Sequence, residues 1–358
     1  MAARAAPFSS STSARSSTRS PSSVRTAESE AALRGGPQRA PTAREVAHLR
    51  ATDSAGALRL VLTVACTASG IALSAAASPF AWLGGQLILS IAMVQWFCLL
   101  HEAGHHTLFR SRAPHVYVGH VASFFSGIPF LSWKTVHNLH HKWAGWQDVD
   151  PTTATFAPRP PGQERGRFEM IVGNVCWKLS LPYFACHYRV AFQRFWRVRN
   201  AASDPATRRA ITWNTVALYG AYAVVAAAVG PWMFGRLFVI AAVLSLVWLE
   251  PVMLSQHTHV PMKLAGADRS QVSAIASPDQ EEYTRSLRVP SWIAAGVLFH
   301  FDAHELHHMY PWLPGYALRK VPYATKNEMR LWPWLRAVKR MSAEDFMLKS
   351  RHETGEDV

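Results

Sequence analysis

The residues of this sequence whose type and spacing could do chemistry are its histidines. Most of the 17 histidines stand in four short clusters, HEAGHH, HNLHH, QHTH and HELHH. Chance would give roughly 0.04 copies of His-x-x-His-His in a chain of this length, whereas HNLHH and HELHH both match that pattern. The clusters contain His101, His105 and His106; His137, His140 and His141; His257 and His259; and His304, His307 and His308.

These spacings predict metal binding. Residues three and four apart lie on one face of a helix, so the histidines of a cluster can converge on one ion. About ten imidazoles beside a membrane would be unfavourable unless metals engaged their lone pairs. A lone histidine more often has a structural role, which is the interpretation for His115, His120, His187 and His352.

The elements that carry the clusters are apolar. Hydrophobic residues make up 49% of the chain and charged residues only 17%, which excludes a soluble globular protein. No charged residue occurs between Leu60 and Leu100, and Arg236 alone interrupts the run from Ala210 to Leu249. Each run has room for two crossings of about 20 residues. We therefore predict four transmembrane helices, at residues 57–76, 80–100, 210–229 and 232–254.

This topology places all four clusters on one side of the membrane, because an even number of crossings separates them. Lysine and arginine flank the apolar runs, and the turn around Pro79 has no charge. By the positive-inside rule, the clusters lie in the cytoplasm, or in the stroma of a plastid-bearing host. The net charge of +14 follows these flanks, so no nucleic-acid partner is expected.

The predicted organisation has three parts. Residues 1–50 are Ser- and Arg-rich and form a disordered tail or an organelle transit peptide. Residues 51–325 form the membrane domain, with half-polar stretches at 116–133 and 168–188 lying along the interface. Residues 326–358 form a cytoplasmic tail. The cysteines form no CxxC pair and are interpreted as packing residues: Cys66, Cys98, Cys176 and Cys186.

The histidine clusters would suit either zinc-dependent hydrolysis or iron-dependent oxygen chemistry. HEAGHH and HELHH contain HExxH, which would suit a membrane zinc protease with Glu102 or Glu305 as general base. A zinc hydrolase needs three protein ligands, which leaves six or more histidines without a role. Eight to ten imidazoles are instead enough for two metals, and imidazole suits iron. Two irons can share the electrons needed to split dioxygen and attack an unactivated C–H bond, so an all-histidine di-iron site fits the sequence better.

HEAGHH, HNLHH and HELHH resemble the three histidine boxes of the membrane fatty acid desaturases. The run SQHTHVP, residues 255–261, is similar to the methyl-end group with delta-12 and omega-3 desaturases. The resemblance implies an all-α integral membrane protein whose cytoplasmic helical cap holds a di-iron site. It also implies an oxygen-dependent enzyme that introduces a cis double bond into an acyl chain. Acyl hydroxylases and carotenoid ketolases share these boxes and remain alternatives, as does a non-catalytic iron-binding membrane protein.

The resemblance also implies a set of iron ligands. His257 is favoured as the ligand from the fourth cluster, with His259 beside it as a supporting residue. His106 is commonly present in the first box and is kept as a candidate. The remaining implied ligands are His101, His105, His137, His140, His141, His304, His307 and His308.

Acidic residues near the boxes are weaker candidates. Glu102 and Glu305 either accept the second N–H of ligand imidazoles or are solvated acids. Asp148, Asp150 and Asp302 either support the ligands or have structural roles.

The chain shows no HPGG haem motif, so the resemblance implies that a separate ferredoxin or b-type cytochrome supplies electrons. We expect this donor to dock on the basic residues from Arg189 to Arg209 and after Arg319. The substrate would be a fatty acyl lipid or an acyl thioester.

Overall fold

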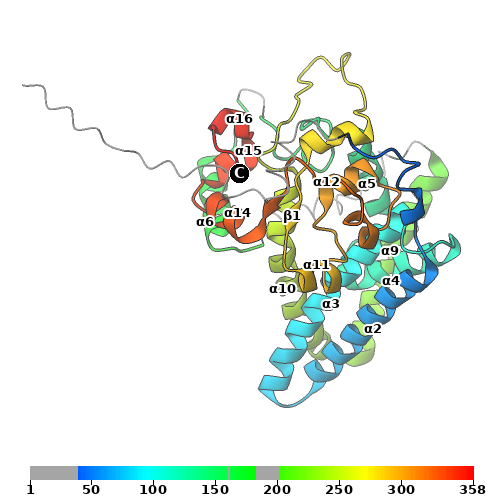
Figure 1. The fold of residues 1–358 in the computed structure, drawn as a ribbon. Coiled ribbons are helices and arrows are strands. Elements are labelled where there is room, and N and C mark those ends of the chain that lie inside the picture. The colour runs from blue at the N-terminus through cyan, green and yellow to red at the C-terminus, as the bar shows by residue number, and fades with distance from the viewer. Residues whose placement is uncertain (1–38, 160–161, 183–201, 203) are drawn as a thin grey trace, which may run out of the picture.

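The computed structural model describes residues 39–159, 162–182, 202 and 204–358 (Figure 1). Several predictions lie outside these residues. They concern the tail before residue 39, Cys186, His187 and most of the basic stretch from Arg189 to Arg209.

Four helices are long and apolar enough to cross a membrane, which confirms the four predicted spans: α2 (Asp53–Ala75), α3 (Pro79–His105), α9 (Pro205–Val229) and α10 (Pro231–His257). Their starts follow from local sequence. The side chains of Thr52, Ser78 and Asp204 accept N-cap hydrogen bonds before α2, α3 and α9. Proline occupies the first position of α3, α9 and α10, where its missing N–H is not needed.

The helices continue beyond the apolar runs at the ends that carry histidine. The prediction ended the second span at residue 100, but α3 extends to His105 and stops where His106 turns left-handed, with a φ of 58°. The fourth span was predicted to end at residue 254, but α10 extends to His257. The last turns of α3 and α10 therefore hold His101, His105 and His257 rigidly.

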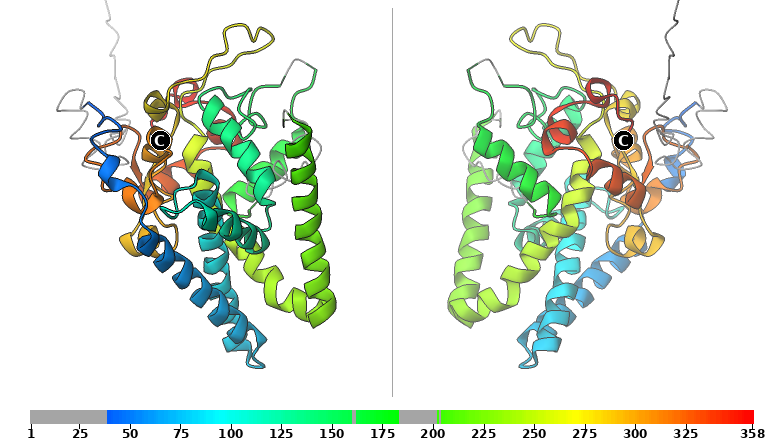
Figure 2. Two further views of the ribbon diagram at one scale, coloured as in Figure 1. Left: turned by 90° about the vertical axis from the view of Figure 1, so that its right-hand side faces the viewer. Right: turned by 90° about the vertical axis from the view of Figure 1, so that its left-hand side faces the viewer.

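The spans form two helical hairpins, α2–α3 and α9–α10. Both hairpin turns lie at the same end of the molecule, and the other helices gather at the opposite end (Figure 2). The chain is therefore an integral membrane protein with a helical cap, in agreement with the predicted fold class.

The buried side chain of Gln86 ties the two hairpins together. Its Nε2 donates to Ser74 Oγ on α2 over 2.8 Å and to the carbonyl of Leu237 on α10 over 3.0 Å. Its Oε1 accepts the backbone N–H of Ala241 over 2.9 Å. Interhelical hydrogen bonds of this kind hold helices together where the surrounding lipid is as apolar as the packing residues.

Short helices build the cap. They are η2 (Ala47–Leu49), α4 (Ala113–Ser126), α5 (Phe130–Trp143), α6 (Arg167–Lys178), η3 (Ser277–Tyr283), α11 (Ser291–Gly296), α12 (His304–Met309), α13 (Gly315–Leu318), α14 (Leu331–Val338), α15 (Ala343–Leu348) and α16 (Arg351–Thr354). Among the described residues, the one sheet is a parallel pair of β1 (Leu287–Arg288) and β2 (Met329–Arg330).

The residues after 325, predicted as a tail, pack onto the rest of the cap. The side chains of Trp334, Val338 and Phe346 are fully buried in the main hydrophobic cluster. The Phe346 ring stacks on Trp177 of α6 with a centroid distance of 4.7 Å. In Figure 1, α14 and α15 lie beside α6.

The two stretches predicted at the membrane interface include the helices α4 and α6. Each exposes hydrophobic side chains at helical spacing, among them Tyr117 and Val121 on α4 and Phe168, Ile171 and Val175 on α6. Their position along the interface stays a prediction.

Candidate metal centre

A first group of histidines joins three helices. His101 and His105 come from the last turns of α3, His137 from α5 and His307 from α12. One nitrogen from each of the four rings lies within 4.8 Å of the others. The Nε2 atoms of His101 and His307 are 3.1 Å apart, and those of His105 and His137 are 2.7 Å apart.

A second group lies beside the first. It consists of His140 on α5, His257 at the end of α10, and His304 and His308 on α12, again with ligand atoms within 4.8 Å of one another. The Nε2 atom of His304 is 2.8 Å from that of His257 and 3.1 Å from that of His308.

The spacing of each histidine box explains how two helices serve both groups. On α5, His137 faces the first group and His140, three residues later, faces the second. On α12, His307 faces the first group, while His304 and His308, four residues apart, share the second. Helical spacing places the histidines of each box on one side of their helix, and the packing of α3, α5, α10 and α12 brings the boxes together.

The remaining cluster histidines take different places. The Nε2 atom of His141 lies 3.0 Å from those of both His137 and His307, so His141 borders the first group. His106 is exposed and lies outside both groups, with its Nε2 atom 2.8 Å from Nζ of Lys134. His259 also lies outside them and contacts Thr354 and Val358.

The chain matches the model of the family described as fatty acid desaturase over residues 77–334, which is more than two thirds of its length. The chain belongs to the fatty acid desaturase family. The match includes all four histidine clusters.

Several desaturases are similar to this chain. It is 23% identical to an sn-1 oleoyl-lipid 12-desaturase of Picosynechococcus sp., with 75% of this chain and 76% of that protein covered. A 12-desaturase of the same name from Synechocystis sp. is 24% identical, with coverages of 67% and 66%. An sn-1 acyl-lipid omega-3 desaturase (ferredoxin) of Nostoc sp. is 21% identical, with coverages of 65% and 64%. The chain thus spans about two thirds to three quarters of the length of these relatives.

Membership in this desaturase family decides against a zinc protease. The glutamates of the two HExxH patterns are also engaged by neighbouring segments, which argues against a role as general base. The carboxylate of Glu305 accepts the backbone N–H groups of Ser286 and Asn327 at 3.1 and 2.7 Å. Burial raises the pKa of Glu305 to about 8. Glu102 accepts from the Thr107 hydroxyl over 2.7 Å and the Gly315 N–H over 3.1 Å. Both side chains thus hold neighbouring segments in place.

The donor set fits metal ions. Nδ1 of His140 lies 2.6 Å from the Asp150 carboxylate, and Nδ1 of His308 lies 2.7 Å from Oε1 of Gln280. The amide nitrogen of Gln280 donates to two carbonyls, which identifies Oε1 as the acceptor. Both Nδ1 atoms therefore carry the proton, and both Nε2 atoms present lone pairs. These Nε2 atoms face each other at 3.2 Å, close to the roughly 3.0–3.4 Å between two nitrogens bound to one divalent ion.

The electrostatics of the cap also favour metal binding. Burial, and secondarily the neighbouring imidazoles, hold the pKa values of five cap histidines well below their usual range. Neutral imidazole is the form that coordinates a metal. The five residues are His137, His141, His304, His307 and His308.

Gly104 in the first box lets an aromatic ring reach the first group. A Cβ atom at this position would lie 2.3 Å from the Trp133 ring. Trp133 in turn stacks on His137, with a centroid distance of 4.3 Å and an interplanar angle of 20°. The close contact between α3 and α5 therefore fixes the orientation of a histidine in the site.

The acidic candidates divide by role. Asp150 supports His140, whereas Asp148 accepts the backbone N–H groups of Ala265 and Gly266 at 2.9 Å. Asp302 pairs with Arg319 over 2.6 Å.

Two lone histidines have the structural role that the sequence suggested. His115 is buried, and its Nε2 accepts the backbone N–H of Phe109 over 3.2 Å. The ring of His120 lies 3.2 Å from the side-chain amide of Asn214.

Two residues in contact with His308 and His140 were missed at the sequence level. Gln280 accepts a hydrogen bond from Nδ1 of His308, and no local sequence pattern predicts this contact. Thr152 donates to Asp150 and lies 3.0 Å from Nδ1 of His140. An aspartate often accepts the backbone N–H of the residue two positions later, in an Asx turn. The Asp-Pro-Thr order could therefore have identified Thr152.

Proposed function

We propose that this chain is an oxygen-dependent acyl-lipid desaturase that introduces a cis double bond with two irons. The observation that carries the proposal is the convergence of eight imidazole nitrogens in two adjacent groups. One iron would be held by His101, His105, His137 and His307, with His141 at its edge. The other would be held by His140, His257, His304 and His308.

The two irons would supply the electron transfer to dioxygen that makes an unactivated C–H bond reactive. In each turnover, the acyl chain loses two hydrogens from adjacent methylenes. A donor supplies two electrons, two protons come from solvent, and dioxygen leaves as two waters. The apolar side chains beside the two groups would orient these methylenes.

A small pocket of about 40 Å³ at the two groups has a lining that suits the methylenes of an acyl chain. Histidines of both groups line it, together with the apolar side chains of Phe97, Trp133, Phe156, Met253 and Phe301. Apolar walls with a few polar groups at one point are typical of a site that orients an apolar ligand. The names of the 12-desaturase relatives specify an oleoyl lipid, and we propose a glycerolipid acyl chain as the substrate class.

Expression in a host that makes only monounsaturated lipids tests this function. Gas chromatography with double-bond location should reveal a new cis double bond, and a His307→Ala variant should lack it. A new hydroxyl or keto group would overturn desaturation in favour of a hydroxylase or ketolase. Purified active protein that held a single zinc and no iron would overturn the di-iron site.

We also propose that the cap faces the cytoplasm or stroma. A cysteine-free background with Ser78→Cys at a hairpin turn, or Lys142→Cys on the cap, tests this with a membrane-impermeant maleimide. The turn should react in intact cells and the cap only after permeabilisation. The reverse pattern would contradict the orientation.

The electron donor is proposed to be a small acidic redox protein such as a ferredoxin, as in the name of the omega-3 relative. Of the basic stretches expected to bind it, the one after Arg319 is described in full, and it exposes Arg336 and Arg340 on and just after α14. Reversing both charges should slow electron transfer from ferredoxin at low salt. Turnover with a small chemical reductant should be unchanged, and an unchanged ferredoxin rate would exclude this docking site.

A further inference from the structure

Arg285 contacts the backbone on both sides of His257. Its own backbone N–H donates to the carbonyl of Gln256 over 3.0 Å. Its guanidinium donates, at distances of 2.9–3.2 Å, to the carbonyls of Ser255, Thr258 and His259.

These contacts complete the end of α10. The last carbonyls of a helix have no partner within the helix, and a cation at that end is favoured by the helix dipole. The side chain of Arg285 is fully buried. A buried guanidinium is unfavourable unless acceptors surround it, and its rigid fork of donors matches several carbonyls at once. Arg285 therefore fixes the turn that carries His257.

The residue after Arg285 holds the other side of the second group. The backbone N–H of Ser286 donates to the Glu305 carboxylate over 3.1 Å, and its hydroxyl accepts the N–H of Glu305 over 3.0 Å. Glu305 directly follows His304. Neighbouring residues thus anchor two histidines, His257 and His304, whose Nε2 atoms are 2.8 Å apart.

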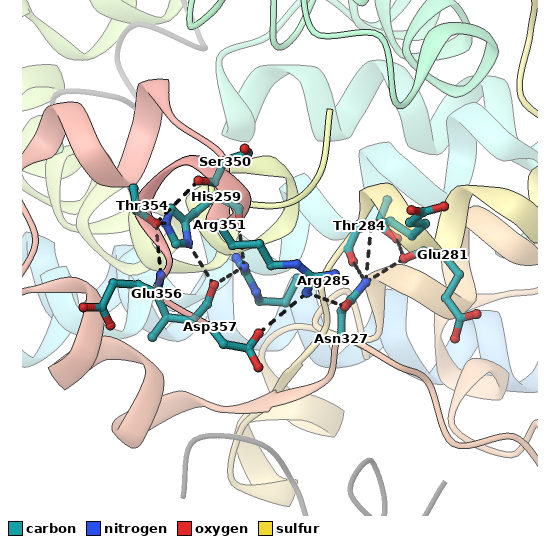
Figure 3. Close-up of polar contacts among 12 residues, drawn as sticks. His259, Glu281, Thr284, Arg285, Asn327, Ser350, Arg351, Thr354, Glu356 and Asp357 are labelled. Carbon is teal, nitrogen blue, oxygen red and sulfur yellow. Dashed lines mark hydrogen bonds and ion pairs between the residues drawn. The ribbon is translucent and has the colours of Figure 1, made fainter. Parts of the chain in front are cut away.

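Residues 354–358 lie against Arg285 and His259 (Figure 3). The guanidinium donates to the backbone oxygen of Val358 over 2.5 Å, and Nδ1 of His259 lies 3.1 Å from the same oxygen. Nε2 of His259 lies 2.7 Å from the hydroxyl of Thr354. Arg285 is therefore held between the end of α10 and the segment after α16.

We propose that Arg285 is a positioning residue for the second group, where it sets His257 against His304, and that residues 354–358 hold it there. The inference rests on the proposed function, because it takes both groups as iron sites. Arg285 acts on the backbone of the ligand turn, so its loss should weaken one metal site and leave the other in place.

The test is the iron content of the full-length protein purified in detergent, measured together with its unfolding temperature. The wild type should hold about two irons per chain. Arg285→Met should hold about one, since loss of a supporting contact typically weakens metal binding roughly 10–100-fold. The matched control is Arg288→Met, three residues later, which removes a half-exposed arginine paired with Glu328 and should keep both irons.

Double variants identify the group that is affected. Combined with His257→Ala, Arg285→Met should lower iron no further, because the same metal is already lost. Combined with His105→Ala, it should leave almost none. Loss of both irons in equal proportion in Arg285→Met alone, or full retention of both, would overturn the inference.

Two further variants decide the matter if Arg285→Met does not fold. Arg285→Lys keeps the positive charge but loses the planar guanidinium that donates to several carbonyls. A chain shortened after residue 350 keeps Arg285 but loses the contact with residues 354–358. Each should release iron from the second group in preference to the first, and iron retention in both would refute the inference. A wild type without two irons would instead refute the proposed function.

Discussion

The Nδ1 atom of His140 lies 2.6 Å from Oδ2 of Asp150, a fully buried carboxylate. The other oxygen of Asp150 accepts both the N–H and the hydroxyl of Thr152, at 2.8 and 2.9 Å, which prevents the carboxylate from turning away. A carboxylate in this position fixes the tautomer of the imidazole and strengthens it as a ligand.

Asp150→Asn should therefore weaken metal binding in the second group roughly 10–100-fold. Competition with a chelator, followed by iron analysis, measures the change. Asp148→Asn is the matched control, because Asp148 caps the backbone at Ala265 and Gly266 and contacts no ligand. Equal affinities in the Asp150 variant and the wild type would refute this role.

Gly104→Ala should destabilise the fold by about 1–3 kcal/mol, because the added methyl group would overlap the buried Trp133 ring. Displacement of Trp133 would also move His137, so iron content should fall with stability. Gly84→Ala on the same helix meets nothing within 4 Å and should be neutral or stabilising by up to about 1 kcal/mol. Thermal unfolding in detergent would show the difference, and matching midpoints for the two variants would contradict it.

Arg319→Met should cost about 3–5 kcal/mol of stability, because it leaves the buried carboxylate of Asp302 without its partner. Arg319 also pairs with Glu328 and donates to the carbonyl of Leu287, so the loop before α12 should loosen as well. The exposed pair of Arg159 and Glu169 provides the control. Arg159→Met should change stability by less than about 1 kcal/mol, and a similar small loss for Arg319→Met would be the contrary result.

Lys339 should make stability depend on pH in the alkaline range. Its ammonium lies over the Trp177 ring, and burial lowers the pKa of Lys339 from 10.5 to about 8. Between these values the unfolded chain binds more protons than the folded one, so stability should rise with pH from about 8 to 10.5. Unfolding midpoints across this range should rise more steeply in the wild type than in Lys339→Met. Parallel curves would show that Lys339 does not titrate in this way.

The spans were predictable because lipid demands long apolar runs. Their histidine-bearing ends were not, since hydropathy falls at Leu100 while backbone hydrogen bonds continue to His105. The end of α3 depends on the left-handed turn at His106, which no apolar pattern reveals. That turn also separates His105 from His106, two adjacent histidines that the box itself does not distinguish.

The assembly of the site was predictable from the joint spacing of the histidine clusters, but the residues that orient the histidines were not. Gln280 and Arg285 lie in a polar segment without periodicity, and they act on His308 and His257 through the folded cap. The packing of residues after 325 escaped detection for a similar reason. Trp334 and Phe346 are buried by contacts with distant segments such as α6. Charged residues near them in the sequence lower the local hydropathy, so no apolar run indicates a buried segment.

The position of Val358 against Arg285 has a consequence for biogenesis. A ribosome makes this stretch after all four spans. The turn with His257 is therefore uncovered while the spans are being made, and we expect iron loading of the second group to follow their synthesis rather than accompany it.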